Sequence, residues 1–171
     1  MAVVEPTDAE LLLQGIHAAG ITHVASLPDI NLVDLIELLE RDERLVHVAL
    51  SREEEGVGIA TGVYLGGGLA ALLCQNEGLL NACNALTTTA LQFQIPIVLV
   101  VWYAGYLGDN AFMRLGEVTE PVLAALGIRA FIPTDAADAR ALLPRVATLA
   151  RMSARPVALL LTKSTLRRFA A

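Results

Sequence analysis

The chain has 171 residues, of which 55% are hydrophobic, 18% charged and 5% aromatic, and its net charge is -6 at pH 7. This length fits a single domain, residues 1–171, large enough to bury a full core. The acidic balance argues against nucleic-acid binding, because the basic residues near the end, Lys163, Arg167 and Arg168, are too few to contact a polyanion. The longest apolar run, residues 97–107, is shorter than the roughly 18 to 20 residues of a membrane span. The excess of apolar residues therefore predicts surface that is buried against partner proteins.

The first residues are acidic and lack the basic segment of a signal peptide, so the sequence predicts a cytoplasmic protein. Cys74 and Cys83 are neither close together nor numerous, and we expect two buried free thiols. His17, His23 and His47 are scattered without the spacing of metal ligands. We therefore expect no metal site made by this chain alone.

Helical and strand patterns alternate along the whole chain. Thr7 and Glu10 form a capping box, and Gly20 ends the helical pattern that follows. Later helices and strands are separated by Pro28-Asp29, by residues 66–68 and by a glycine-containing loop from 103 to about 117. The expected strands cover residues 22–27, 45–50, 69–75, 95–102, 128–132 and 156–161, and the later helices cover 31–41, 52–65, 78–93, 118–126 and 136–150.

These six strands are each preceded by a helix, and their apolar runs are continuous rather than alternating. Continuous apolar strands indicate burial on both faces, which is typical of a parallel sheet. We therefore predict an α/β three-layer sandwich with a six-stranded, mainly parallel sheet. Ligands of such folds bind outside the carboxyl ends of the strands, so the loops after residues 27, 50, 75 and 102 are candidates for the site.

Three usual functions of α/β domains lack their motifs here. No G-x-G-x-x-G follows a strand, and there is no G-x-x-x-x-G-K-[ST] and no G-x-S-x-G. The sequence therefore argues against a dinucleotide enzyme, a phosphate-loop enzyme and a serine hydrolase.

The remaining signal is acidic. Glu53, Glu54 and Glu55 open a helix, and from Gly56 to Gly108 the only charged residue or histidine is Glu77. Acids at a helix start are favoured by the macrodipole, which is one explanation of the cluster. Successive helical residues point about 100 degrees apart, however, so at most one of the three faces the strand ends. A carboxylate against so much uncharged surface would lose hydration and could hold or share a proton.

Other polar residues follow neighbouring strands. Asp29 is either a turn residue or a second carboxylate at the same edge of the sheet, and Asn76 is either a helix cap or a ligand-binding residue. Gln75, Glu77 and Asn81 stand beside Asn76, with Glu77 near the first turn of the next helix. Trp102 and Tyr103 end the fourth strand and are candidate interface anchors.

At these residues the sequence resembles the pyrimidine-binding domain of thiamine diphosphate enzymes, above all that of sulfopyruvate and phosphonopyruvate decarboxylases, from about Leu11 to Thr134. In that superfamily a glutamate stands nine residues before the glycine of an A-x-G-Y-like turn, and counting back from Gly62 gives Glu53. The motifs that carry the resemblance are VASLPDINLVDLIELLE, SREEEGVGIATGVYLGG, QNEGLLNACNAL and IPIVLVV.

The resemblance implies a fold and a mechanism. The fold would be the thiamine diphosphate-binding fold of the pyrimidine type, with Glu53, Gln75, Asn76, Glu77, Gly78 and Asn81 near the cofactor. Glu53 would hydrogen-bond the N1' nitrogen of the aminopyrimidine and favour its imino tautomer, which deprotonates the thiazolium C2. The activated cofactor would then attack a small 2-oxo acid, which loses carbon dioxide and leaves as an aldehyde.

The resemblance also implies a partner. The diphosphate and Mg²⁺ belong to a second domain with a G-D-G…N-type motif, which this chain lacks. A complete site would need a beta subunit that carries that domain, so we expect a hetero-oligomer in which this chain is the alpha subunit. Glu53 and residues 75–81 would lie at the interface.

The chain departs from the relatives at three places. They resemble Q-N-S-G-L-G-N where this chain has Glu77 and Leu80, and they carry an arginine after the fourth strand where this chain has Ala104. The missing arginine suggests a substrate without a terminal sulfonate or phosphonate. The segment around Asp29, LPDINL, is similar to the L-P-G-D-F-N-L of pyruvate decarboxylases but one residue shorter, which makes Asp29 a candidate catalytic acid.

Two other functions remain open from the sequence. A carboligase would use the same activated cofactor to attack a second carbonyl group, and the choice would depend on the partner chain. A non-catalytic scaffold or regulatory subunit would keep the fold alone; Glu53 argues against it, whereas Glu77 and Leu80 favour it.

Overall fold

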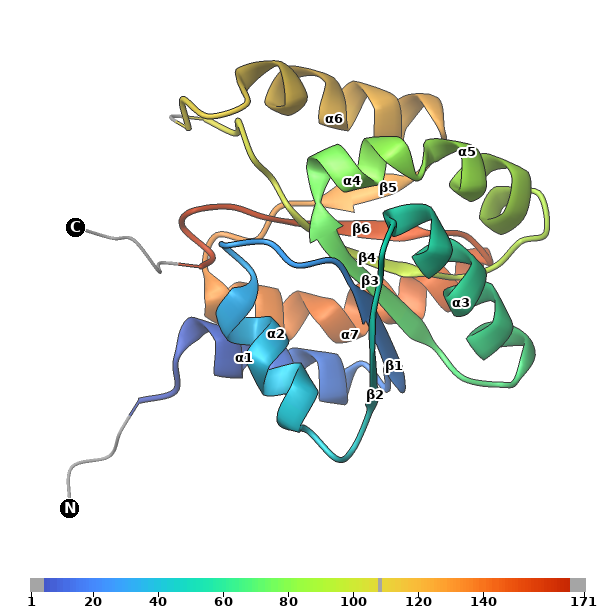
Figure 1. Cartoon of the computed structure of the whole chain (residues 1–171), viewed down its shortest axis with the longest axis horizontal. Coiled ribbons are helices and arrows are strands. Elements are labelled where there is room, and N and C mark those ends of the chain that lie inside the picture. Colours follow the sequence, from blue (N-terminus) through green and yellow to red (C-terminus); the bar gives the residue numbers. More distant parts are fainter. Residues whose placement is uncertain (1–4, 108, 167–171) are drawn as a thin grey trace.

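The structure is a computed structural model that describes residues 5–107 and 109–166. The described residues do not include Arg167, Arg168, Gly108 or the first four residues, which were used in interpreting the sequence. Figure 1 shows one layered α/β body in which helices cover both faces of a sheet. The α/β fold expected from the sequence is confirmed.

Helices and strands alternate as predicted, with shorter strands than expected. Thr7 caps the first helix through the predicted capping box, in which its N–H donates to Glu10 at 2.7 Å. The elements in chain order are α1 Asp8–Ala18, β1 His23–Ser26, α2 Val33–Arg41, β2 Val46–Ala49, α3 Glu53–Leu65, β3 Ala70–Gln75, α4 Asn76–Asn81, α5 Cys83–Ala85, the π-helix η1 Leu86–Leu91, β4 Val98–Trp102, α6 Met113–Ala125, β5 Arg129–Phe131, α7 Ala136–Ser153 and β6 Val157–Leu161.

All neighbouring strands pair in parallel, in the order β2-β1-β3-β4-β6-β5. The chain runs outward from β1 to β2 and then returns to place β3 on the other side of β1. Consequently the connections after β1 and β3 leave the sheet toward opposite faces, and this reversal of strand order is where open α/β sheets bind ligands.

Side chains alternate between two cores. Leu73 and Val100 point toward α1, α2 and α7, whereas Leu72 and Val101 point toward α3, the segment 76–91 and α6. Figure 1 shows these two sets of helices on opposite faces of the sheet. The central strands β3, β4 and β6 are buried on both faces as predicted, but β2 and β5 are edge strands and are only partly buried. Val46 in β2 is 51% exposed, because no further strand or helix covers it.

The helix expected over 118–126 begins earlier, at Met113. Gly116 suggested a loop, but here it is a packing glycine, since a Cβ on it would collide with the Gly105 carbonyl. Gly105 itself has a φ of +78°, which favours glycine. The two glycines let the start of α6 pack directly on the backbone of the loop after β4.

The helix expected over 78–93 begins at Asn76 and is divided into α4, α5 and η1. Within its second half, Thr87 and Thr88 donate their hydroxyls to the carbonyls four residues earlier, each at 2.8 Å. Such bonds compete with the regular helical ladder, and π-turns occur where that ladder is disturbed. None of the helices within residues 5–107 and 109–166 is long and apolar enough to cross a membrane.

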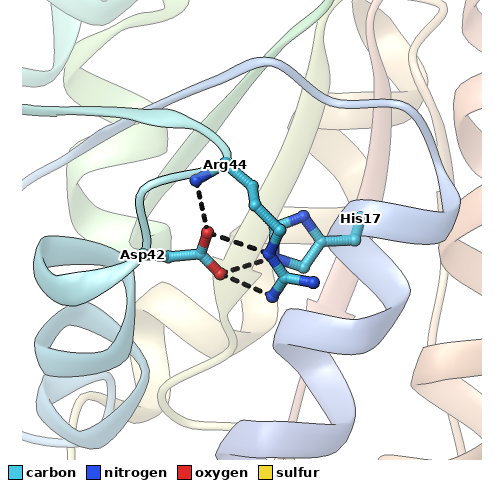
Figure 2. Close-up of polar contacts among 3 residues, drawn as sticks. All are labelled: His17, Asp42 and Arg44. Atoms are coloured by element: carbon cyan, nitrogen blue, oxygen red, sulfur yellow. Dashed lines mark hydrogen bonds and ion pairs between the residues drawn. The ribbon is translucent and has the colours of Figure 1, made fainter.

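At the amino ends of the first strands, three side chains join α1 to the turn between α2 and β2 (Figure 2). The carboxylate of Asp42 accepts hydrogen bonds from the backbone N–H, Nε and Nη2 of Arg44 at 2.8, 3.2 and 2.8 Å. It also contacts His17 Nε2 at 2.6 Å. Only 5% of the Asp42 side chain is exposed, so Asp42 is a nearly buried carboxylate whose oxygens are paired with Arg44 and His17.

Candidate functional site

The three glutamates at the start of α3 have three different environments. Glu55 accepts hydrogen bonds from the backbone N–H groups of Ser51 and Arg52 at 3.0 and 3.1 Å, so it caps the helix as the macrodipole explanation predicts. Glu54 is paired with Arg52 Nε at 3.0 Å in a largely exposed ion pair. Glu53 is half-buried, and no hydrogen bond or ion pair joins it to any residue in 5–107 or 109–166.

The Glu53 carboxylate instead lies against Gly78 in α4. A Cβ on Gly78 would collide with Oε1, Cδ and Cγ of Glu53, so this position has room for the glutamate only because it is glycine. The neighbouring Gly56 in α3 is equally close to the sheet, since a Cβ on it would lie 2.9 Å from Leu50 Cδ1 and would collide with Leu72. Two glycines thus hold the start of α3 against β3 and α4.

Asp29 lies in the same neighbourhood, at the end of β1. Burial raises the pKa of the Cys74 thiol well above its ordinary range, and the negative charges of Glu53 and then Asp29 raise it further. The two carboxylates therefore both lie near Cys74 in β3. Asp29 Oδ1 accepts a hydrogen bond from the Asn31 N–H at 2.7 Å, which is the turn role considered from the sequence. This bond leaves Oδ2 of the half-buried carboxylate for other contacts.

Asn76 is fully buried and joins three segments of the chain. Its side-chain N–H₂ donates to the Ala104 carbonyl and to Thr119 Oγ1, each at 2.9 Å. The expected capping role is wrong, because Gln75 is the residue before the helix and Asn76 points into the loop after β4 and into α6. Within residues 5–107 and 109–166, no donor reaches its buried Oδ1 atom.

The remaining expected residues differ in their exposure. Gln75 is half-buried, whereas Glu77 and Asn81 are exposed on α4. Trp102 and Tyr103 are 3% and 4% exposed, so they belong to the core of this chain and cannot anchor a partner as expected. The Tyr103 hydroxyl is shared between the Gly116 carbonyl at 2.9 Å and Glu120 Oε1 at 3.0 Å, and burial together with Glu120 raises its pKa.

A cavity of about 580 Å³ opens at the carboxyl ends of β3, β4 and β6, whose following loops leave the sheet at the left in Figure 1. We call it the strand-end cavity. It lies at the reversal of strand order, since Asn31 follows β1 and Gln75 ends β3. Its size is that of a small-molecule site. Its lining residues are Asn31, Gln75, Trp102, Ala104, Asp109, Ala111, Phe112, Lys163, Ser164 and Leu166.

The outer wall of the strand-end cavity is organised by Asp109. Its carboxylate accepts hydrogen bonds from the N–H groups of Gly105 and Ala111 at 3.1 and 3.3 Å and contacts Lys163 Nζ at 2.9 Å. Burial alone would raise the pKa of Asp109, but these hydrogen bonds outweigh it and lower the pKa. Asp109 and Lys163 were not predicted as site residues. Asp109 lies in the loop after β4, one of the four loops expected to carry the site, whereas Lys163 lies in the loop after β6, which was not among them. Lys163 follows β6 by two residues, so extending the same rule to that strand finds it.

Two further expectations concern the cysteines and metal binding. Both cysteines are free as expected, and Cys74 is buried, but Cys83 is only partly buried. Among the described residues, no three His, Cys, Asp or Glu side chains gather as a metal site.

Residues 7–127 match the family described as thiamine pyrophosphate enzyme, N-terminal TPP binding domain. The chain is 34% identical over 155 residues to a sulfopyruvate decarboxylase subunit alpha of Methanococcus maripaludis, covering 90% of this chain and 93% of that one. It is 33% identical over 158 residues to the subunit of that name from Methanothermobacter thermautotrophicus, covering 91% and 96%. A phosphonopyruvate decarboxylase of Streptomyces viridochromogenes is 34% identical over 99 residues, which are 58% of this chain and 25% of that enzyme.

The fold is also that of a domain in a larger enzyme. A 2-oxoglutarate:ferredoxin oxidoreductase from Magnetococcus marinus matches with a TM-score of 0.76 at 14% identity, over 94% of this chain and 29% of that one. At this identity the match shows the fold alone. The family match and the extended similarity in sequence agree with it. The chain therefore belongs to the thiamine pyrophosphate enzymes, as a protein of the N-terminal TPP-binding-domain family that is similar over nearly its whole length to sulfopyruvate decarboxylase alpha subunits.

Proposed function

We propose that this chain is the pyrimidine-binding alpha subunit of a two-chain, thiamine diphosphate-dependent 2-oxo acid decarboxylase, and that Glu53 activates the cofactor. The names of the relatives, which include sulfopyruvate and phosphonopyruvate decarboxylases, support a decarboxylase subunit. The observation that carries the role of Glu53 is its lack of a partner. Of the three adjacent glutamates, Glu55 caps the helix and Glu54 pairs with Arg52. Glu53 instead lies against Gly78, next to the uncharged segment that begins at Gly56.

The residues at this position fit an aminopyrimidine ring. Such a ring offers a nitrogen that exchanges a proton with a carboxylate and an amino group that donates hydrogen bonds. Glu53 would hold the ring nitrogen, Gly78 keeps the space in front of the carboxylate clear, and the buried Oδ1 of Asn76 is an acceptor that still lacks a donor. Gln75, Glu77 and Asn81 lie on the same segment and would complete the surroundings of the ring.

When bound, thiamine diphosphate supplies an acidic carbon that adds to the keto group of a 2-oxo acid and accepts the electrons released with carbon dioxide. This chain contributes the proton handling. Glu53 would hold and return a proton at the ring nitrogen, in a setting where the uncharged wall limits competing water. Asp29, which follows β1 at the same edge of the sheet, would supply a proton to the product.

The proposal assigns the diphosphate and Mg²⁺ to a beta subunit. The outward side of α3 suits such a partner, because it is uncharged beyond its first turn. Leu65 and Tyr64 are 75% and 38% exposed there, and Gly58 and Gly62 have no atom within 4 Å of where a Cβ would stand. An exposed apolar patch of this kind marks a docking surface.

The test replaces Glu53 by glutamine in the complex of this chain with its beta subunit. We expect the proton on C2 of bound thiamine diphosphate, followed by NMR in deuterated water, to exchange roughly 100- to 10,000-fold more slowly. Glu54→Gln is the matched control, since it makes the same chemical change one residue away at a surface ion pair. Exchange at the wild-type rate in Glu53→Gln would refute the role of Glu53 and support a non-catalytic subunit.

A further inference from the structure

Lys163 is the only lysine of the chain; the other 11 of its 12 basic residues are arginines. It stands two residues after β6, and its side chain is 66% exposed. Among the described residues 5–107 and 109–166, it is also the single cation that lines the strand-end cavity. The loop after β4 contributes no arginine to this cavity, because Ala104 and Gly105 stand where the relatives are expected to carry one. A positive charge thus reaches the same cavity from a different strand.

The other charge of the cavity is already used within the protein. Asp109 is 10% exposed and receives two backbone N–H groups of its own loop besides the Lys163 ammonium. An ammonium has three N–H donors, and Asp109 occupies one of them. The backbone donors stabilise the Asp109 carboxylate independently of the lysine. The accessible charge in the strand-end cavity is therefore positive.

We propose that Lys163 determines substrate specificity by binding a terminal anion of the 2-oxo acid, such as a sulfonate, phosphonate or second carboxylate. This inference rests on the proposed function and names the substrate class of that site. The absence of an arginine after β4 then does not exclude an anionic substrate, because the charge comes from β6 instead.

The geometry of the strand-end cavity supports this assignment. Gln75 lines the cavity and lies three residues before Gly78, which contacts Glu53, so the cavity and the Glu53 carboxylate lie at the same carboxyl edge of the sheet. Two further polar groups line the strand-end cavity, the hydroxyl of Ser164 and the amide of Asn31. The Ser164 hydroxyl also forms a 2.8 Å hydrogen bond with the Thr162 hydroxyl. A lysine charge beside hydroxyl and amide groups is the kind of set that binds an oxyanion.

The experiment compares 2-oxo acids in the complex of this chain with its beta subunit. Substrates with a sulfonate, phosphonate or carboxylate at the far end are measured beside pyruvate, which has none. For Lys163→Met we expect KM to rise roughly 10- to 100-fold for the anionic substrates, with kcat little changed. KM for pyruvate should stay within about threefold of the wild type, and Lys163→Arg should restore most of the affinity for the anionic substrates.

Arg114→Met is the matched control, because Arg114 is a cation of the neighbouring helix start that pairs with Glu117 and does not line the cavity. A second readout needs no turnover: labelling of the Lys163 amine, followed by peptide mass, should be slowed by the sulfonate-bearing acid and not by pyruvate. If the complex decarboxylates these acids but Lys163→Met changes KM equally for all of them, or for none, the assignment of Lys163 is wrong. If no acid is decarboxylated but the sulfonate still protects Lys163, the proposed function is wrong and the anion site stands.

Discussion

Asp42 and Glu53 are both carboxylates near helix ends, yet their surroundings are opposite. Asp42, at the amino ends of the strands, accepts hydrogen bonds from Arg44 and contacts His17, as Figure 2 shows. Glu53, at the carboxyl ends, has no such partner in residues 5–107 and 109–166 and rests on a glycine. An acid whose hydrogen bonds are all satisfied serves the fold, whereas a half-buried acid without partners costs the fold energy and is retained for another purpose.

Of the variants that test this comparison of Asp42 and Glu53, Gly78→Ala is expected to have the largest effect. The added Cβ collides with the end of the Glu53 side chain, which can move aside, so we expect the chain to fold but the carboxylate to be displaced. Displacement of a catalytic group by about 1 Å can cost about 100-fold in rate, and we expect a loss of that order in decarboxylation by the complex. In a Glu53→Gln background the same alanine should cost little more, because both changes act on one group. A full additional loss in the double variant would show that Gly78 acts independently of Glu53.

Asp42→Asn tests the other side of the comparison. Losing the charge-assisted hydrogen bonds should lower the free energy of unfolding by about 2 kcal/mol, measured by urea denaturation near neutral pH. The rate per folded complex should not change, because Asp42 lies at the opposite edge of the sheet. A lower rate with unchanged stability would reverse the assignment of the two acids.

The difference in the free energy of unfolding between the wild type and Asp42→Asn should depend on pH, because of the same contacts. Hydrogen bonds from Arg44, and to a smaller extent from His17, hold the pKa of Asp42 far below its ordinary value of 3.8. A depressed pKa in the folded state gives stability that is fully present above the unfolded pKa and is lost as the pH falls toward the folded one. The difference between wild type and Asp42→Asn should therefore be constant above about pH 5 and shrink below about pH 4. A difference that grows in acid would contradict the pairing.

The smallest effect concerns the outer side of α3. Gly58→Ala and Gly62→Ala should each stabilise the isolated chain by about 0.5 to 1 kcal/mol, because alanine favours a helix and nothing opposes the new methyl group. Gly15→Ala is the contrasting control, since its Cβ would lie 2.7 Å from Leu143 Cδ1 and should destabilise. If the beta subunit packs closely on α3, the same two alanines weaken the complex. Unchanged association would place the partner elsewhere.

Much of the fold could be predicted because its signals are local. The Thr7 cap, the glycine after α1 and the continuous apolar runs of β3, β4 and β6 each specify an element within a few residues. The start of α6 could not be predicted in this way. Gly116 has the local signature of a loop, and its reason for being glycine is a carbonyl eleven positions earlier in the chain.

The candidate site was predictable to a smaller extent. The resemblance, counted back from Gly62, predicts Glu53 as the carboxylate of the site, and the structure shows that the other two glutamates have different environments. The environment of Asn76 was not predictable, since its two partners come from the loop after β4 and from α6. Lys163 was overlooked because the loop after β6 was not considered; β6 lies next to β4 in the sheet, which brings Lys163 to the same cavity.

The side-chain amide of Asn76 also holds the loop after β4 and the helix α6 together. It fixes Ala104 on one side and Thr119 on the other, so the ends of the intervening segment are set by a buried group outside that segment. Between these anchors, Asp109, Ala111 and Phe112 line the strand-end cavity. The loop that carries these residues is therefore held at both ends by one buried side chain that is not part of it, so a substitution within the loop can alter the cavity while its two attachment points stay fixed.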